Sequence, residues 1–123
     1  MTAITTRVTA NGGVRVPGKN AISINLDTAR GSVLISNNDG AAFQGHPLNI
    51  NLGLAALSLE ADGHVLAETT RVHLPLQGIT VSASVLVGKE GPHGSFGFTL
   101  FDEAGASLYT YPYTQMDWGS VTI

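Results

Sequence analysis

The sequence predicts an all-β domain, an antiparallel two-sheet β-sandwich with about eight or nine strands, immunoglobulin-like or related. Apolar and polar residues alternate at period two through most of the chain, and short stretches rich in Gly, Pro, Asn and Asp separate the alternating segments. With 123 residues and no cysteine, the chain has the size of one domain, residues 1–123, which can bury a core without disulfide bonds. The cysteine and tryptophan spacing of a true immunoglobulin domain is absent.

The alternating segments define the expected strands in order along the chain. They lie at residues 2–10, 21–28, 32–36, 48–60, 64–76, 79–89, 95–101 and 107–113, with a further strand at 119–123. Residues 48–60 also contain helix formers, but their apolar positions keep period two and then change phase near Ala55 and Ala56. A β-bulge produces such a change, so we expect one long bent strand there, with a short helix as the alternative.

A single turn sets the register of the hairpin formed by the two strands at 95–101 and 107–113. Asp102 and Gly105 suit the capping position and the left-handed position of a three-residue loop. That loop places Leu100 opposite Leu108, whereas a four-residue loop would place Leu100 opposite Tyr109.

The register decides which way three tyrosines point. With the three-residue loop, Tyr109, Tyr111 and Tyr113 form a row on the solvent face, and with the longer loop they belong to the core. We favour the solvent-facing row, because Phe96 and Phe98 already supply a large inward face. An exposed row offers flat apolar rings and hydroxyl groups, which suit a sugar ring, a peptide or a partner protein. Ordinary core or cross-strand packing is the alternative.

The Gly-rich loop at residues 88–94 is a second candidate recognition element. It carries Lys89, Glu90 and His93, and functional residues collect on loops of this kind. Trp118 either joins the tyrosine surface or closes one end of the sandwich. The alternative for the loop is a flexible hairpin tip with solvated charges.

Composition excludes several classes of partner. Charged residues make up only 12% of the chain, the formal net charge is -3, and the six Lys and Arg are scattered singly. No basic stripe is available for nucleic acid. Neither a Sec signal peptide nor an apolar segment long enough to span a membrane is visible, so we expect a soluble chain without membrane insertion, in a compartment that the sequence leaves undetermined.

Signatures of catalysis and metal binding are also missing from the sequence. It contains no Gly-x-Ser-x-Gly motif, no cysteine nucleophile and no phosphate-binding loop. His46, His64, His73 and His93 show none of the spacings typical of metal ligands. We expect no catalytic residue, no metal site and no cofactor.

The leading hypothesis is a non-enzymatic binding module that recognises a protein or a glycan through the tyrosine row, Trp118 and the Gly-rich loop. The first alternative is a structural or self-assembling subunit, a homo-oligomer in which an uncharged edge strand such as residues 2–10 pairs with another copy. A metal-dependent enzyme that uses the scattered histidines is the third hypothesis.

Overall fold

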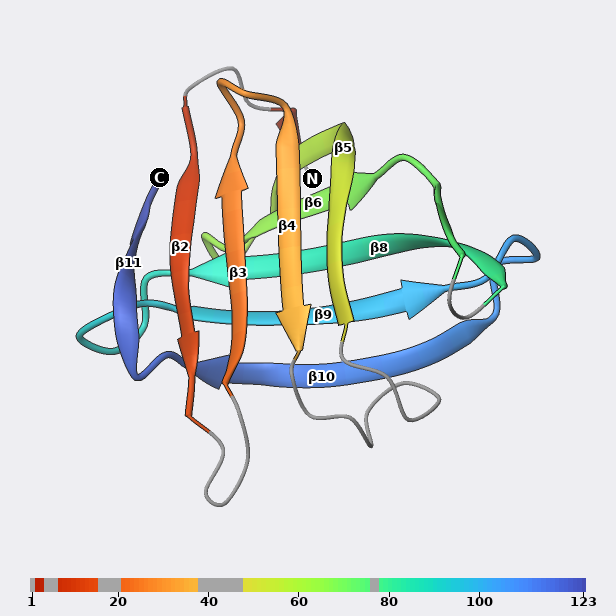
Figure 1. Ribbon diagram of the computed structural model, residues 1–123. Coiled ribbons are helices and arrows are strands. Elements are labelled where there is room, and N and C mark those ends of the chain that lie inside the picture. Colours follow the sequence, from red (N-terminus) through yellow and green to blue (C-terminus); the bar gives the residue numbers. More distant parts are fainter. Residues whose placement is uncertain (1, 4–6, 16–20, 38–47, 76–77) are drawn as a thin grey trace.

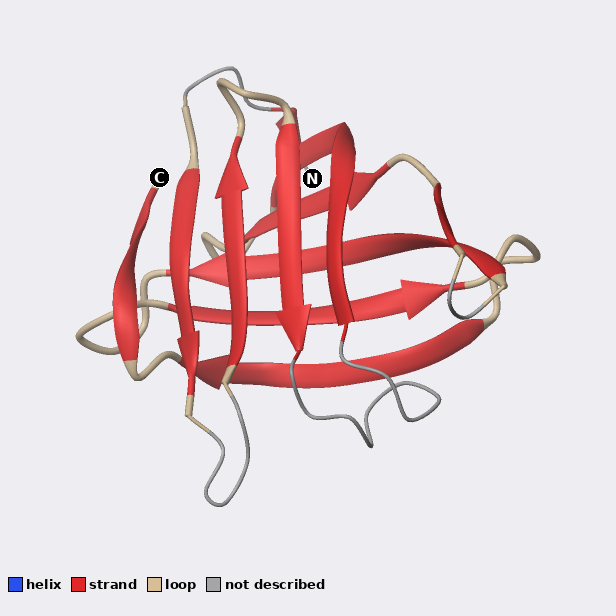
Figure 2. Cartoon of the chain, in the orientation of Figure 1, coloured by secondary structure: helices blue, strands red, loops and turns tan. Residues whose placement is uncertain are grey.

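The computed structural model describes residues 2–3, 7–15, 21–37, 48–75 and 78–123, which form antiparallel strands and, within these ranges, no helix (Figure 2). The strands are β1 (Thr2–Ala3), β2 (Thr9–Val14), β3 (Ile22–Asp27), β4 (Ser32–Asn37), β5 (Leu48–Leu59), β6 (Val65–Thr69), β7 (Val72–Leu74), β8 (Ile79–Gly88), β9 (Ser95–Phe101), β10 (Ser107–Gln115) and β11 (Trp118–Thr122). The predicted all-β class is confirmed.

Nine of these strands form one continuous antiparallel sheet, in the order β10-β9-β8-β6-β5-β4-β3-β2-β11, while β1 pairs with β5 and β7 pairs with β8. The sheet curls like half a barrel, so that β2 to β5 cross steeply over β8, β9 and β10 (Figure 1). We call these parts the front half (β2 to the start of β5, with β11) and the back half (the end of β5 to β10). Two separate sheets, as expected for a sandwich, are not confirmed.

The long strand β5 connects the two halves. Its residues 48–53 pair with β4 and its residues 54–59 pair with β6, and the register shifts between Leu54 and Ala56. The predicted long strand and its bulge are therefore confirmed, and the alternative of a short helix is wrong. Because a bulge bends the strand that carries it, β5 can leave the front half and enter the back half without losing its pairing.

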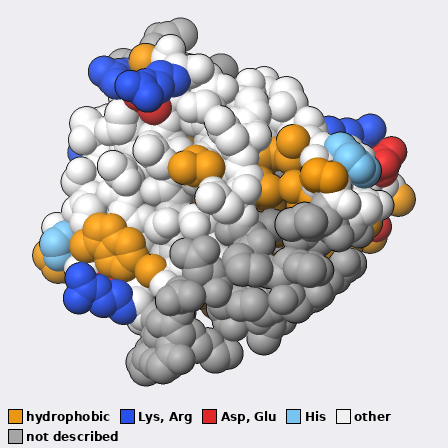
Figure 3. All heavy atoms as spheres, viewed as in Figure 1, with side chains coloured by type: hydrophobic (Ala, Val, Ile, Leu, Met, Phe, Trp, Pro, Cys, Tyr) orange, Lys and Arg blue, Asp and Glu red, His pale blue; other side chains and the backbone are white. Residues whose placement is uncertain are grey.

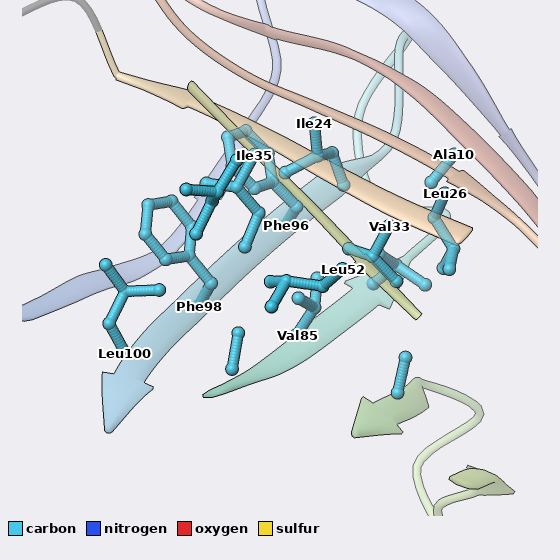
Figure 4. Packing of buried hydrophobic residues seen from close by; sticks show 14 of the residues in the cluster. Ala10, Ile24, Leu26, Val33, Ile35, Leu52, Val85, Phe96, Phe98 and Leu100 are labelled. Carbon is cyan, nitrogen blue, oxygen red and sulfur yellow. The ribbon is translucent and has the colours of Figure 1, made fainter. Parts of the chain in front are cut away.

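The core lies between the inner faces of the two halves (Figure 4). Alternate residues of each strand point inward, which is the physical basis of the period-two pattern in the sequence. Each large side chain buried in this way contributes about 1.5–3 kcal/mol. Those that are fully buried include Leu26, Val33, Ile35, Leu52, Val85, Phe96 and Leu100.

The β9–β10 hairpin has the predicted turn. The backbone N–H of Asp102 donates to the carbonyl of Ala106 at 2.9 Å, and the N–H of Gly105 donates to the carbonyl of Asp102 at 3.0 Å. The Asp102 carboxylate accepts hydrogen bonds from the N–H groups of Ala104 and Ala106, both at 2.9 Å. Gly105 has a φ of 85°, the left-handed conformation that the sequence predicted for it.

Beyond the turn, the predicted register is wrong. Ser107 pairs with Phe101, but the next paired residue is Tyr109, which lies opposite Leu100, so Leu108 is the extra residue of a bulge. A three-residue loop therefore leads into the pairing that was expected only for a four-residue loop.

The tyrosines consequently do not form one solvent-facing row. Tyr109 and Tyr111 pack against the hydrophobic core, with ring centroids 5.9 and 6.0 Å from that of Phe98. A second register shift between Tyr111 and Thr114 turns Tyr113 to the outer face. Burial of two more rings beside Phe96 and Phe98 favours the bulge over a regular ladder.

Two other predicted strands differ from the structure. Residues 64–76 were expected as one strand, but Thr70 and Arg71 separate β6 from β7. The segment 2–10 was expected at an edge, yet β2 lies between β3 and β11, and the strands at the two ends of the sheet are β10 and β11.

Replacing Tyr111 by alanine is expected to lower the free energy of unfolding by about 2 kcal/mol, because a partly buried ring packed on Phe96 is lost. Leu108→Ala is the control: Leu108 is exposed at the bulge, and its loss is expected to cost less than about 0.5 kcal/mol. Denaturant titration measures both values. Equal losses in the two variants would contradict the inward position of Tyr111.

Candidate functional site

A shallow groove of 290 Å³ lies on the outer face of the back half, across β6, β8, β9 and β10. Two cross-strand rows of side chains form it. One row is mainly apolar and consists of Leu66, Leu86, Gly97, Pro112 and Tyr113, and the other carries the hydroxyl groups of Ser84, Thr99 and Thr110.

Gly97 lines the groove at the point where the backbone of β10 lies close to β9. A Cβ atom on Gly97 would lie 2.8 Å from the backbone nitrogen of Tyr113 and 3.0 Å from the carbonyl oxygen of Tyr111. The second bulge of β10 brings its backbone this close to β9, so only glycine fits there. An isolated Gly between Phe96 and Phe98 in an alternating strand is a sequence signal for such a close approach.

Tyr113 is held at one end of the groove by Glu90 and His64. The Tyr113 hydroxyl donates to Glu90 Oε1 at 2.6 Å, and Glu90 Oε2 is hydrogen-bonded to His64 Nε2. The His64 and Tyr113 rings are 4.7 Å apart between centroids, and His64 Nδ1 lies 3.2 Å from Asp62 Oδ2. These contacts fix the orientation of the Tyr113 ring.

Gly88 leaves room for this cluster. A Cβ atom at Gly88 would overlap the Tyr113 hydroxyl, Glu90 Oε1 and His64 Cδ2. Residues from the β5–β6 turn, the β8–β9 loop and β10 therefore converge over a glycine of β8.

The cluster fixes the ionisation of its carboxylate and its phenol. Hydrogen bonds from Tyr113 first, and then from His64, lower the pKa of Glu90 to about 2. Burial first, and then the neighbouring Glu90 carboxylate, raises the pKa of Tyr113. Glu90 is therefore an anion and Tyr113 a neutral hydrogen-bond donor over the whole physiological pH range.

Among the residues proposed from the sequence, the structure brings Glu90 and Tyr113 together. His93, in the same loop, donates from Nδ1 to the carbonyl of Gly119 at 3.1 Å, so the loop also contacts β11. Lys89 is exposed. Trp118 belongs to the front half, where it pairs with Gly13 on β2.

The Arg15 guanidinium lies over the Trp118 ring, 5.7 Å from the ring centroid, whereas Tyr109 and Tyr111 pack against the core. Leu66 and Leu86 were not predicted as site residues, because in the sequence they are ordinary alternating residues of strands. His64 was predicted only as one of the scattered histidines.

Within the described ranges, no three His, Asp or Glu side chains are grouped so that they could hold a metal ion. His46 lies outside these ranges. The described part of the chain also contains no long apolar helix of the kind that crosses a membrane.

The chain matches no protein-family model, no curated protein and no solved structure. Its own groove, cluster and surface chemistry are therefore the basis for assigning a function.

Replacing Tyr113 by phenylalanine is expected to raise the pKa of Glu90 from about 2 toward 4.5, because the largest stabilising hydrogen bond of the carboxylate is lost. A ¹³C NMR titration of the Glu90 carboxyl measures this change. Tyr109→Phe is the control, since the Tyr109 hydroxyl accepts its hydrogen bond from Asn37 and not from the cluster. An equal Glu90 pKa in the wild type and in Tyr113→Phe would contradict the hydrogen bond between Tyr113 and Glu90.

The lowered pKa also determines how pH affects stability. Since the Glu90 pKa in the folded protein lies below its ordinary value of 4.5, the cluster stabilises the fold above about pH 4.5 and loses this contribution as the pH falls toward 2. In Glu90→Gln, the free energy of unfolding should therefore depend less on pH in this acid range.

Proposed function

We propose that the chain is a non-enzymatic binding module whose groove takes up an apolar segment of a partner protein. The observation that carries this proposal is that Tyr113 and the Gly-rich loop, two recognition elements expected from the sequence, meet through Glu90 at one end of the groove. None of the described residues that line the groove is charged, and its larger side chains are apolar or aromatic. Such a surface matches the apolar centre of a protein interface.

The size and rigidity of the groove support a small anchor. A volume of 290 Å³ is at the lower end of the range for ligand sites and suits one or two side chains rather than a large ligand. The hydrogen bond to Glu90 holds the Tyr113 ring in place before a partner arrives. Little side-chain entropy is then lost on binding, which favours affinity.

A protein segment suits the groove better than a glycan does. Sugar hydroxyls need many polar partners, but the groove offers the hydroxyls of Ser84, Thr99, Thr110 and Tyr113. Those of Thr99 and Thr110 are 3.2 Å apart and bonded to each other, and that of Tyr113 is bonded to Glu90. The apolar row supplies the larger part of the contact surface. Burial of apolar area is therefore the main source of binding energy at this site.

The state of Glu90 supports binding rather than catalysis. Both of its carboxylate oxygens accept hydrogen bonds, one from Tyr113 and one from His64. A carboxylate with a pKa of about 2 is also a weak base near neutral pH.

The open sheet favours one second function, that of a self-assembling subunit. Within the described chain, β10 and β11 each have a strand partner on one side only. Unpaired strand edges can add a strand from another copy.

Random-peptide display against the whole chain, followed by NMR mapping of one selected peptide, tests the proposed groove. Selected peptides should carry an apolar anchor and shift the signals of Leu86 and Gly97. Thr110→Arg, which puts a charge at the rim of the groove, should weaken binding about tenfold or more, because a charge is buried against an apolar anchor. Thr122→Arg, on the exposed face of β11, should leave the affinity unchanged. Two results would rule out the groove: peptides that shift the NMR signals of residues on other surfaces, or peptides that bind Thr110→Arg with the affinity of the wild type.

Sedimentation at several protein concentrations tests the second function. We expect a monomer at every concentration, since the proposed binding role needs no second copy. Concentration-dependent association that Ser120→Lys abolishes would instead support edge pairing through β11, because a lysine on an edge strand opposes strand addition.

A further inference from the structure

The front half carries a second hollow, on its own outer face, that the proposed function does not use. Its volume is 340 Å³, and it lies over β3, β4 and β5. On the described part of this face, uncharged polar side chains and backbone surround separate hydrophobic patches (Figure 3). The hollow is lined by Asn25, Asp27, Arg30, Ser32, Leu34 and Asn51.

Strand pairing explains the shape of the hollow. Asn25, Leu34 and Asn51 are cross-strand neighbours, so the two amides stand on either side of Leu34, about 10 Å apart. The next row contains Asp27, Ser32 and Gly53, and the Thr70 side chain lies over Gly53. Asp27 and Ser32 line the hollow on this side, and the amide row lines it on the other.

Leu34 gives the hollow an apolar surface. It is one of two large hydrophobic side chains that the described chain exposes, with 37% of its surface accessible. It stands alone between amides and hydroxyls, so it is too small a patch for a protein interface. A ligand that covers Leu34 must therefore combine a small apolar face with many polar groups.

The charged side of the hollow is organised by Asp27. Its carboxylate accepts hydrogen bonds from Arg7 Nε at 3.2 Å, Arg7 Nη2 at 2.8 Å and the N–H of Ala29 at 3.0 Å. The Arg30 Nε atom lies 3.9 Å from Asp27 Oδ2, and the Arg30 side chain is 82% exposed. Arg30 is therefore placed beside the hollow with most of its N–H donors facing solvent.

We propose that this hollow binds one pyranose ring of a saccharide, with the C–H face of the ring on Leu34 and its hydroxyls bonded to Asn25 and Asn51. The side-chain amides supply both donors and acceptors, which matches hydroxyl groups that also do both. Ser32 and Arg30 bind further hydroxyls on the side toward Asp27. Unlike the groove beside Tyr113, this hollow has the polar groups that a sugar requires.

The site is independent of the proposed function, because it lies on the front half and shares no residue with the groove. A failure of either proposal therefore leaves the other intact.

NMR titration of the ¹³C,¹⁵N-labelled chain with the methyl glycosides of glucose, galactose, mannose and glucuronic acid tests the proposal. At least one glycoside should shift the side-chain amides of Asn25 and Asn51 and the methyl groups of Leu34, with a dissociation constant of about 1 mM, because a shallow site covers little of a single ring. Asn25→Ala and Asn51→Ala should each weaken this binding by about tenfold.

Asn11→Ala is the matched control. Asn11 is exposed in the same cross-strand row, next to Asn25, but does not line the hollow. Its loss should leave the affinity unchanged, and the amide spectrum of each variant shows that it is folded.

Three results would overturn the saccharide site. They are no shift with any of the four glycosides, an equal loss of affinity in Asn11→Ala, or shifts at the same residues with inorganic phosphate alone. The last result would identify an anion site at Arg7 and Arg30 instead.

Discussion

The bulge between Leu54 and Ala56 allows one antiparallel sheet to bury its own inner face. A flat sheet of nine strands would leave that apolar face in water, and the described chain has no helix to cover it. By bending inside β5, the sheet folds its front half over its back half and forms the core between them. The groove and the hollow both lie on outer faces of the sheet. Because the bend buries the inner face, these outer faces are not needed for the core and can carry polar residues.

The period-two pattern was enough to predict the class of fold and most strands, because alternation follows directly from which face of a strand is buried. The bend in β5 was also predictable, since a bulge changes the phase of the pattern at Ala55 and Ala56. The pairing of distant strands was not, and two sheets were expected where the chain forms one. Alternation reports which residues point inward but does not say which strands are neighbours.

The hairpin of β9 and β10 shows where local reasoning fails. The turn at Asp102 and Gly105 depends on adjacent residues and was predicted correctly. The bulge at Leu108 shifts the following residues of β10 so that Tyr109 and Tyr111 pack against the Phe98 ring. The stabilisation comes from tertiary packing, so it cannot be predicted from the residues of the turn.

The candidate groove was predictable in its parts and not in its assembly. Tyr113 and Glu90 were both proposed from the sequence, for separate reasons, but their hydrogen bond joins residues 23 positions apart. His64 reaches them from the β5–β6 turn. The position of Gly97 between two phenylalanines was the one local signal at this site, because a glycine inside a strand marks a close backbone approach, here that of β10.

The uncharged lining of the groove has a kinetic consequence. The lining itself offers no charge that attracts a partner over a distance, and association rates of about 10⁵–10⁶ M⁻¹s⁻¹ are typical of surfaces without such steering. Salt would act on this rate through Glu90 at the end of the groove, because the lining itself carries no charge to screen. A lasting complex at this site would therefore have to come from slow dissociation, governed by how well the partner fills the groove.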